Sequence, residues 1–122
     1  MVTLYLWFNA VMYLVLGVWC TVLPEKTAAA VGFAFAKPAG RSEFVTVYGG
    51  LEFGLGVFFL ICALQSGWRE TGLLLGLCLY AALTFWRLYT FATIEGIAGF
   101  PRVAFVLESA LFVSALVLWL RR

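Results

Sequence analysis

Three ionisable side chains lie inside long apolar stretches of this sequence: Glu52, Arg87 and Glu108. A charge at membrane depth is costly, so it normally faces a helix-bundle interior or a watery cavity, finds a partner there and marks a functional site. A guanidinium cannot release its proton, so Arg87 requires an acidic partner or a bound anion. Two carboxylates around one arginine leave one in excess. We expect the spare glutamate to bind a proton, contact a cationic ligand or stay hydrated.

The composition is that of a membrane protein. Of 122 residues, 65% are hydrophobic and only 11% are charged, whereas an ordinary soluble domain is about 25% charged. The lipid bilayer is therefore the expected principal partner. The net charge of +2 is small, so the sequence predicts no nucleic-acid partner.

Four stretches are long enough to cross the hydrocarbon core, which takes about 20 mainly apolar residues. We predict spans over residues 4–23, 44–64, 71–91 and 102–120. Short connections make successive spans antiparallel. The predicted fold is all-α, a single domain over residues 1–122 that forms an integral membrane antiparallel four-helix bundle, with both chain ends at the same membrane face.

The connection between the first two spans, residues 24–43, is the longest one. It opens with Glu25-Lys26 and ends in a polar run up to Glu43, while its apolar middle is too short to span the membrane. Two interpretations stay open for this segment, a lid over a cavity and a spacer at the membrane surface.

The alternating path places the three charged residues in one half of the bilayer. The start of the second span, the end of the third and the start of the fourth lie at the same face. Counting inward at 1.5 Å per residue puts Glu52 roughly 12 Å deep, Glu108 roughly 9 Å and Arg87 roughly 6 Å. Because the third span neighbours both others, Arg87 is expected between the two carboxylates.

Further polar residues share helix faces with these charges. Tyr48 lies one turn before Glu52, and Tyr80 and Thr84 step toward Arg87 at intervals of four and three residues. The predicted ligand site thus contains Glu52, Arg87, Glu108, Tyr48, Tyr80 and Thr84. A purely structural ion-pair cluster that sets helix register is an alternative, and so is an Arg87 side chain that extends to the nearby interface.

Small residues predict where helices pack closely. Two GxxxG pairs and a glycine stripe beside Glu52 allow tight contacts between spans, and the predicted packing positions are Gly49, Gly50, Gly54, Gly56, Gly72 and Gly76. Asn9 is the only strongly polar residue of the first span. We expect its amide to hydrogen-bond a neighbouring span.

Several kinds of chemistry lack their usual residues. The chain contains no histidine, the commonest general base and metal ligand. Its three cysteines lack the spacing of a redox pair. We therefore predict no metal and no cofactor. Two carboxylates and an arginine still allow acid–base work, but an enzyme is the least favoured function class.

The run from Gly40 to Gly56, with Tyr48-Gly49-Gly50-Leu51-Glu52 at its centre, resembles a family of small bacterial four-helix membrane proteins known as a domain of unknown function. The turn at Pro24-Glu25-Lys26, an arginine late in the third span and a glutamate early in the fourth are similar to it as well. The resemblance implies a bacterial inner-membrane location and a four-helix bundle, and it implies no activity.

The basic residues outside the spans give a nearly even count for membrane orientation. Three lie on the terminal side and four on the other side. The unopposed Arg121-Arg122 pair directly after the last span favours termini in the cytoplasm.

Two function classes follow from these features. The chain binds or transports a small ionic or amphipathic ligand at the charged cluster, and because one small bundle is thin for a transport pathway, it does so as a homo-oligomer. Alternatively it is a structural or accessory subunit of a larger membrane complex, in which the charges serve helix packing.

Overall fold

The computed structural model describes residues 1–122, which are almost entirely helical. Four helical segments are long and apolar enough to cross a membrane: Val2–Val22, Pro38–Leu64, Ser66–Thr93 and Phe100–Leu120. These segments contain the four predicted spans almost completely, and all four start two to six residues earlier than predicted. The protein is thus all-α, with the helices of a multi-pass membrane protein.

Eight helical elements follow one another along the chain: α1 (Val2–Val22), α2 (Pro24–Ala30), α3 (Pro38–Phe44), the π-helical η1 (Val45–Leu51), α4 (Glu52–Leu64), the 3₁₀ turn η2 (Ser66–Trp68), α5 (Arg69–Thr93) and α6 (Phe100–Leu120). Prolines occupy the first turn of α2, α3 and α6, where the missing N–H has no intrahelical partner to lose. Elements α3, η1 and α4 are continuous, so together they make the second long helix.

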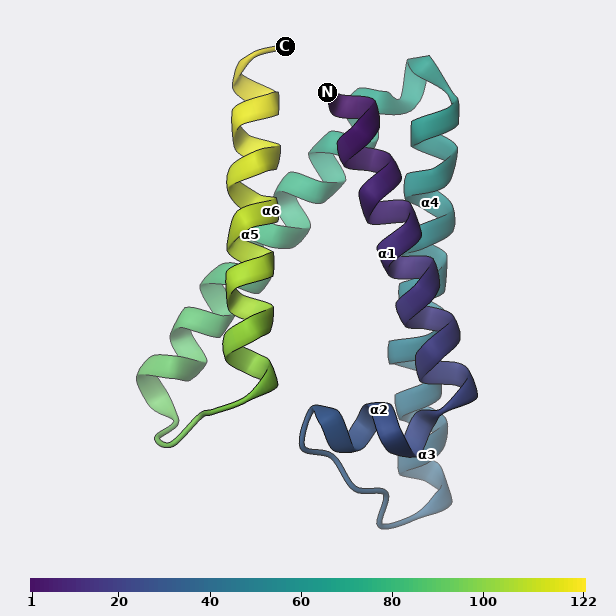
Figure 1. The fold of residues 1–122 in the computed structure, drawn as a ribbon, viewed down its shortest axis with the longest axis vertical. Helices are drawn as coiled ribbons and strands as arrows, with labels where there is room; N and C mark the ends of the chain where they lie inside the picture. Colours follow the sequence, from purple (N-terminus) through teal and green to yellow (C-terminus); the bar gives the residue numbers. More distant parts are fainter.

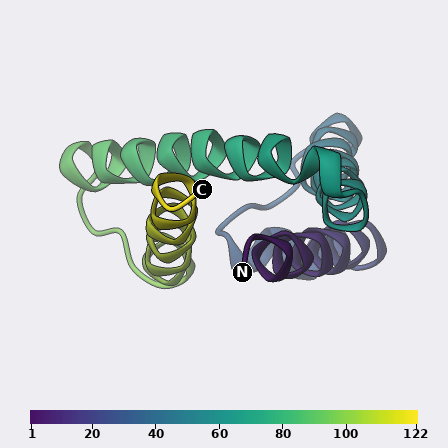
Figure 2. The same cartoon turned by 90° about the horizontal axis from the view of Figure 1, so that it is seen from above.

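The four long helices are arranged as two packed pairs, α1 with the α3–η1–α4 helix and α5 with α6 (Figure 1). Helix α5 connects the pairs because it crosses obliquely and contacts both α4 and α1. Seen from above, α1 and α6 lie on the same side of α5 (Figure 2). Both termini lie at one end of the molecule (Figure 1).

The largest core cluster joins α1, α4, α5 and α6. Leu6, Phe59, Leu73 and Tyr80 are almost completely buried in it. Tyr13 of α1 stacks on Phe59 of α4 with ring centroids 5.9 Å apart. The three-helix junction of α1, α4 and α5 is therefore the best-packed part of the molecule.

Helices α1 and α3–α4 approach each other closely at glycines. A Cβ on Gly17 would lie 2.7 Å from the backbone nitrogen of Phe53 and 2.9 Å from the carbonyl oxygen of Gly49. One on Gly56 would lie 2.7 Å from the backbone nitrogen of Leu14. Gly49 and Gly56 were expected at a helix contact; Gly17, their partner on α1, was not.

The glycines of α5 also lie at close contacts. A Cβ on Gly72 would be 2.7 Å from the Cβ of Cys62 on α4, and one on Gly76 would be 2.6 Å from the Tyr5 hydroxyl on α1. These two residues let α5 cross both helices of the other pair.

Gly50 and Gly54 differ from the other four predicted packing glycines. A Cβ on either would have no atom of another residue within 4 Å. Within this chain Gly50 and Gly54 make no close helix contact. They form a strip without side chains on the surface of the second long helix, the Gly50–Gly54 strip.

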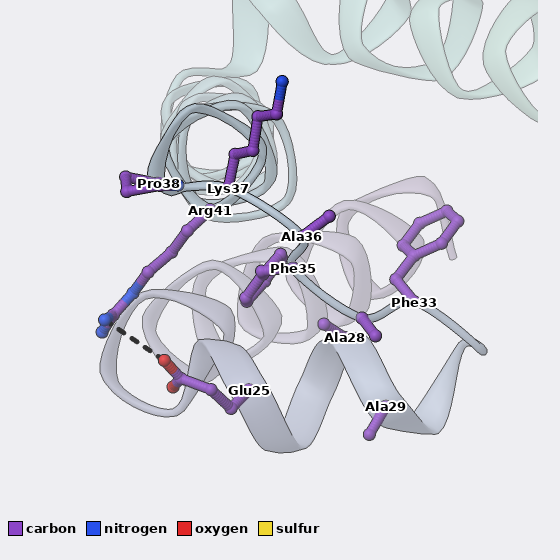
Figure 3. Close-up of a pocket in the computed structure, with 10 residues that line it drawn as sticks. Glu25, Ala28, Ala29, Phe33, Phe35, Ala36, Lys37, Pro38 and Arg41 are labelled. Carbon is purple, nitrogen blue, oxygen red and sulfur yellow. Dashed lines mark ion pairs between the residues drawn. The ribbon is translucent and has the colours of Figure 1, made fainter.

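The predicted connection over residues 24–43 is shorter than expected, because residues 38–43 already belong to the second long helix. Its first part forms the short helix α2, which folds back. Ala28 of α2 packs with Cys20 and Phe44 in a second, smaller core. Glu25 and Arg41 form an ion pair at 3.2 Å beside a hollow of about 490 Å³ (Figure 3). This segment is therefore packed against the ends of α1 and α3.

Candidate functional site

Arg87 of α5 and Glu108 of α6 form a two-point ion pair. The Arg87 Nε donates to Glu108 Oε2 at 2.5 Å, and Nη2 donates to Oε1 at 2.6 Å. The side chains are 23% and 12% exposed, respectively. Two parallel hydrogen bonds of this kind neutralise the guanidinium charge and fix the relative orientation of the two side chains. Arg87 thus has its acidic partner, and that partner is Glu108.

Glu52, the first residue of α4, belongs to none of the ion pairs. Its Oε2 atom is buried and makes no hydrogen bond. The carboxylate faces α1, where it is close enough to Tyr13 and Cys20 to act on them electrostatically. A buried oxygen without a partner is rare in proteins and calls for an explanation.

The local backbone before Glu52 is unusual. Residues Val45–Leu51 form a π-helix rather than an α-helix. π-Helical turns inside longer helices occur frequently at functional sites. This one contains the Tyr48-Gly49-Gly50-Leu51 run and ends where the unpaired carboxylate begins.

Tyr13 of α1 is close enough to both carboxylates, those of Glu52 and Glu108, for an electrostatic effect. Its ring is buried. Sequence reasoning missed this residue. The signal was present, because Tyr5, Asn9 and Tyr13 recur every four residues and so share one face of the first span.

A hydrogen-bonded network lies next to this site. The Tyr80 hydroxyl of α5 donates to Asn9 Oδ1 of α1, and Asn9 Nδ2 donates to the Tyr5 carbonyl oxygen at 2.8 Å. Asn9 and Tyr80 are almost completely buried. Asn9 therefore joins two spans, and the hydroxyl of Tyr80, assigned to the ligand site from the sequence, is already used in this contact.

Two hydroxyl groups beside the ion pair have no partner. Thr84 lies one turn before Arg87 and is 8% exposed, and Ser109 follows Glu108 in sequence. The Oγ1 of Thr84 and the Oγ of Ser109 are buried and make no hydrogen bond. Together with Glu52 Oε2, these hydroxyl groups are buried polar atoms near the charged residues that could still form hydrogen bonds.

Tyr48 lies at the edge of the charged region. Its ring stacks on Phe44 with centroids 4.6 Å apart and an interplanar angle of 18°. It is also near enough to Arg87 for an electrostatic effect. Tyr48 also packs edge-on against Phe33, so it lies between these aromatic rings and the charged region.

Glu52, Arg87 and Glu108 are each partly exposed, and none of them lines the groove between α1 and α6 or the hollows beside α2. No group of three His, Cys, Asp or Glu side chains is placed to hold a metal ion. The unpaired, half-buried Glu52 is therefore the point at which a ligand could make a new polar contact.

Residues 1–120 match the model of a protein family described as a domain of unknown function (DUF4345). The chain belongs to this family. No curated protein and no solved structure matches it significantly. Membership in DUF4345 assigns no activity to this chain.

In this DUF4345 member the polar side chains come from all four long helices. Tyr13 is on α1, Glu52 on α4, Arg87 on α5 and Glu108 on α6. The Arg87–Glu108 pair is neutral as a unit, whereas Glu52 carries a negative charge or a proton. Chemically, this arrangement is suited to binding a cationic group or a proton.

Proposed function

We propose that this protein binds or transports a small ionic or amphipathic ligand at Glu52, beside the Arg87–Glu108 pair. The observation that carries the proposal is the buried, unpartnered Oε2 of Glu52. A carboxylate in an apolar medium takes up a proton or finds a cation. The Arg87 guanidinium is not the cation that Glu52 needs, because its Nε and Nη2 already donate to Glu108.

The charge balance favours a cationic ligand over an anionic one. With Arg87 neutralised by Glu108, the uncompensated group is the Glu52 carboxylate, and the aromatic ring within its electrostatic range is that of Tyr13. Aromatic faces attract ammonium groups, and cages of such rings bind quaternary ammonium ions. A protonated Glu52 would also suit exchange of the cation for a proton.

The proposal is tested with tetraethylammonium as the probe. Radiolabelled tetraethylammonium is titrated onto the purified protein in lipid nanodiscs. We expect saturable binding that Glu52→Gln abolishes, because the amide keeps the shape of the side chain and removes its charge.

Glu95→Gln is the matched control. Glu95 lies exposed in the connection between α5 and α6, so its replacement should leave binding unchanged. Thermal unfolding of both variants shows that they are folded. Unchanged binding by a folded Glu52→Gln protein would contradict the proposal.

A structural or accessory role is the second candidate function. Arg87 and Glu108 are already paired with each other, and this favours a structural role. Such an ion pair between two helices sets their register without any ligand. In that case the protein should copurify with a larger membrane complex, and substitutions on its lipid-facing helix surfaces should release it.

We further propose a bacterial inner-membrane location with both termini in the cytoplasm. The family resemblance and the Arg121-Arg122 pair support this assignment. In the bilayer the two helix pairs would form one antiparallel four-helix bundle, held together by the crossing of α5.

A homo-oligomer is part of the same proposal. The open Gly50–Gly54 strip supports it, because small residues let helices of different copies approach closely. Gly54→Leu should then lower the oligomeric state measured by light scattering in detergent. The same variant should keep the helix content of the parent, since a side chain at residue 54 has free space in the monomer.

A further inference from the structure

A hollow of about 490 Å³ lies at the end of the molecule remote from both termini, between α2, the connection that follows it and the start of α3 (Figure 1, Figure 3). Its lining combines an apolar surface with charged side chains. The apolar part includes Ala28, Phe33 and Phe35, and the charged part consists of Glu25, Lys37 and Arg41. This volume, with a mainly apolar lining and a few polar groups, is typical of a small-molecule site.

The length of the second long helix places this hollow at the level of the lipid headgroups. The helix Pro38–Leu64 has 27 residues and is therefore about 40 Å long, whereas the hydrocarbon core of a bilayer is about 30 Å thick. About 10 Å of the helix thus extends beyond the hydrocarbon. Its last turn is apolar, while its second turn contains Arg41, Ser42 and Glu43. The excess length is therefore at the Arg41 end, beside the hollow.

Glu25 and Arg41 form a loose ion pair at one side of the hollow (Figure 3). Their closest atoms, Oε1 and Nη1, are 3.2 Å apart, and the side chains are 61% and 56% exposed. Arg87 and Glu108, by contrast, are joined by two hydrogen bonds and are mostly buried. A carboxylate has two acceptor oxygens and a guanidinium has five N–H donors. Glu25 and Arg41 can therefore each bind a ligand group as well as each other.

The charges of this pair favour a ligand that carries both signs of charge. A cation bound to Glu25 alone is repelled by Arg41, and an anion bound to Arg41 alone is repelled by Glu25. A zwitterion with an ammonium group close to a phosphate group makes a favourable contact with both side chains. Lys37 also lines the hollow, but its ammonium group points away from the pair (Figure 3). The charge balance at the pair is therefore set by Glu25 and Arg41.

We propose that this hollow binds the headgroup of phosphatidylethanolamine, with the ammonium group on Glu25 and the phosphate on Arg41. The apolar wall at Ala28, Phe33 and Phe35 contacts the glycerol end of the acyl chains. The primary ammonium group donates hydrogen bonds to a carboxylate, which the trimethylammonium group of phosphatidylcholine cannot do. Phosphatidylglycerol has no ammonium group and leaves Glu25 opposite a phosphate. This lipid site is separate from Glu52 and does not depend on the ligand proposed there.

The test measures which phospholipid the purified protein retains. Nanodiscs with equal parts of dioleoyl phosphatidylethanolamine, phosphatidylglycerol and phosphatidylcholine are analysed by native mass spectrometry, and the lipids that stay bound are identified by mass. We expect the parent to retain phosphatidylethanolamine about fivefold more often than either other lipid, the preference that a charged contact at an exposed site supports. Glu25→Gln should shift the preference to phosphatidylglycerol, because Arg41 is then unopposed. Arg41→Gln should abolish the preference.

Glu70→Gln is the matched control. Glu70 forms an exposed ion pair with Arg122 at 3.3 Å, and neither residue lines the hollow. Its replacement should therefore keep the lipid preference of the parent. Thermal unfolding shows that each variant is folded, which we expect because exposed ion pairs contribute little to stability.

Several results would overturn the lipid site. One is a parent protein without a preference for phosphatidylethanolamine, and another is a folded Glu25→Gln variant that keeps the preference. An equal loss in Glu25→Gln and Glu70→Gln would show that any exposed ion pair attracts this lipid and that the hollow adds nothing. Soluble phosphoethanolamine should not displace the lipid, because it lacks the acyl chains. Displacement at low concentration would identify a solute as the ligand and reject the lipid.

Discussion

The Arg87 guanidinium binds the Glu108 carboxylate through two parallel hydrogen bonds of 2.5 Å and 2.6 Å, whereas Glu52 has no cationic partner. The arrangement divides the charged residues into a neutral pair between α5 and α6 and a lone acid on α4. The Arg87–Glu108 pair joins α5 to α6, whereas Glu52 has no partner and is available to a ligand. The following predictions test this division and the packing around it.

Replacing only one residue of the Arg87–Glu108 pair should lower the free energy of unfolding strongly, whereas replacing both residues together should not. Arg87→Met leaves Glu108 uncompensated at 12% exposure, so we expect the free energy of unfolding to fall by about 3 kcal/mol. The double variant Arg87→Met/Glu108→Leu should regain most of this loss. Thermal unfolding in detergent measures both effects.

The exposed Glu25–Arg41 pair provides the comparison for that experiment. Both side chains are more than half exposed, and exposed pairs contribute about 0–1 kcal/mol. Arg41→Met should therefore have a small effect. An equally large loss at Arg41 and Arg87 would show that burial of the second pair is not what makes it important.

Tyr80→Phe should weaken the junction of α1 and α5. The variant leaves Asn9 Oδ1 buried without its donor, and hydrogen bonds between membrane helices contribute about 0.6–2 kcal/mol. Tyr89→Phe removes a hydroxyl from an exposed ring on the same helix and should be neutral. If Tyr80→Phe and Tyr89→Phe unfold at the same temperature as the parent, the network adds nothing to stability.

Gly17→Ala should destabilise the α1–α4 pair. The new methyl group would lie 2.7 Å from the backbone of Phe53, and relieving such a clash typically costs about 1–3 kcal/mol. Gly40→Ala in α3 has free space and should stabilise the helix by about 0.5–1 kcal/mol. The two substitutions should thus shift the unfolding temperature in opposite directions, and shifts of the same sign would contradict the helix contact at Gly17.

Cysteine labelling should place Ser66 and Glu95 on opposite sides of the membrane. Ser66 lies in the turn at the same end as both termini, and Glu95 lies in the connection at the far end of α5 (Figure 1). With cytoplasmic termini, a membrane-impermeant maleimide added to intact cells should label Glu95→Cys and spare Ser66→Cys. The parent, whose cysteines lie inside the helices, gives the background. The reverse pattern would invert the proposed orientation.

The long helices were predictable because their causes are local. Apolar length selects a spanning helix. The helix start at Pro38 was not predicted, because residues 38–43 are polar and were assigned to the connection. The depths predicted for Glu52, Arg87 and Glu108 depend on counting residues along each helix, and the start of the second long helix at Pro38 puts Glu52 farther from the helix end than was counted. Their presence in one half of the molecule needed no knowledge of how the helices pack.

Rotation about each helix axis was not predictable in the same way. The choice of Glu108 over Glu52 as the partner of Arg87 depends on which faces α4, α5 and α6 turn toward one another, and both glutamates satisfied the depth criterion. The π-helical segment before Glu52 contributes to this, because it changes the hydrogen-bond register and so the direction of every side chain that follows.

The amino-acid sequence by itself therefore determined the four long apolar helices and their order along the chain, since these depend on hydropathy and length. Only the tertiary structure decided that α6 packs on α5 and that Tyr13 approaches both carboxylates. It likewise decided that an apolar groove opens between α1 and α6. The reason is physical: contacts between helices depend on their rotation and crossing angles, which arise from close packing at residues such as Gly17 and Gly76 rather than from any property of one segment alone.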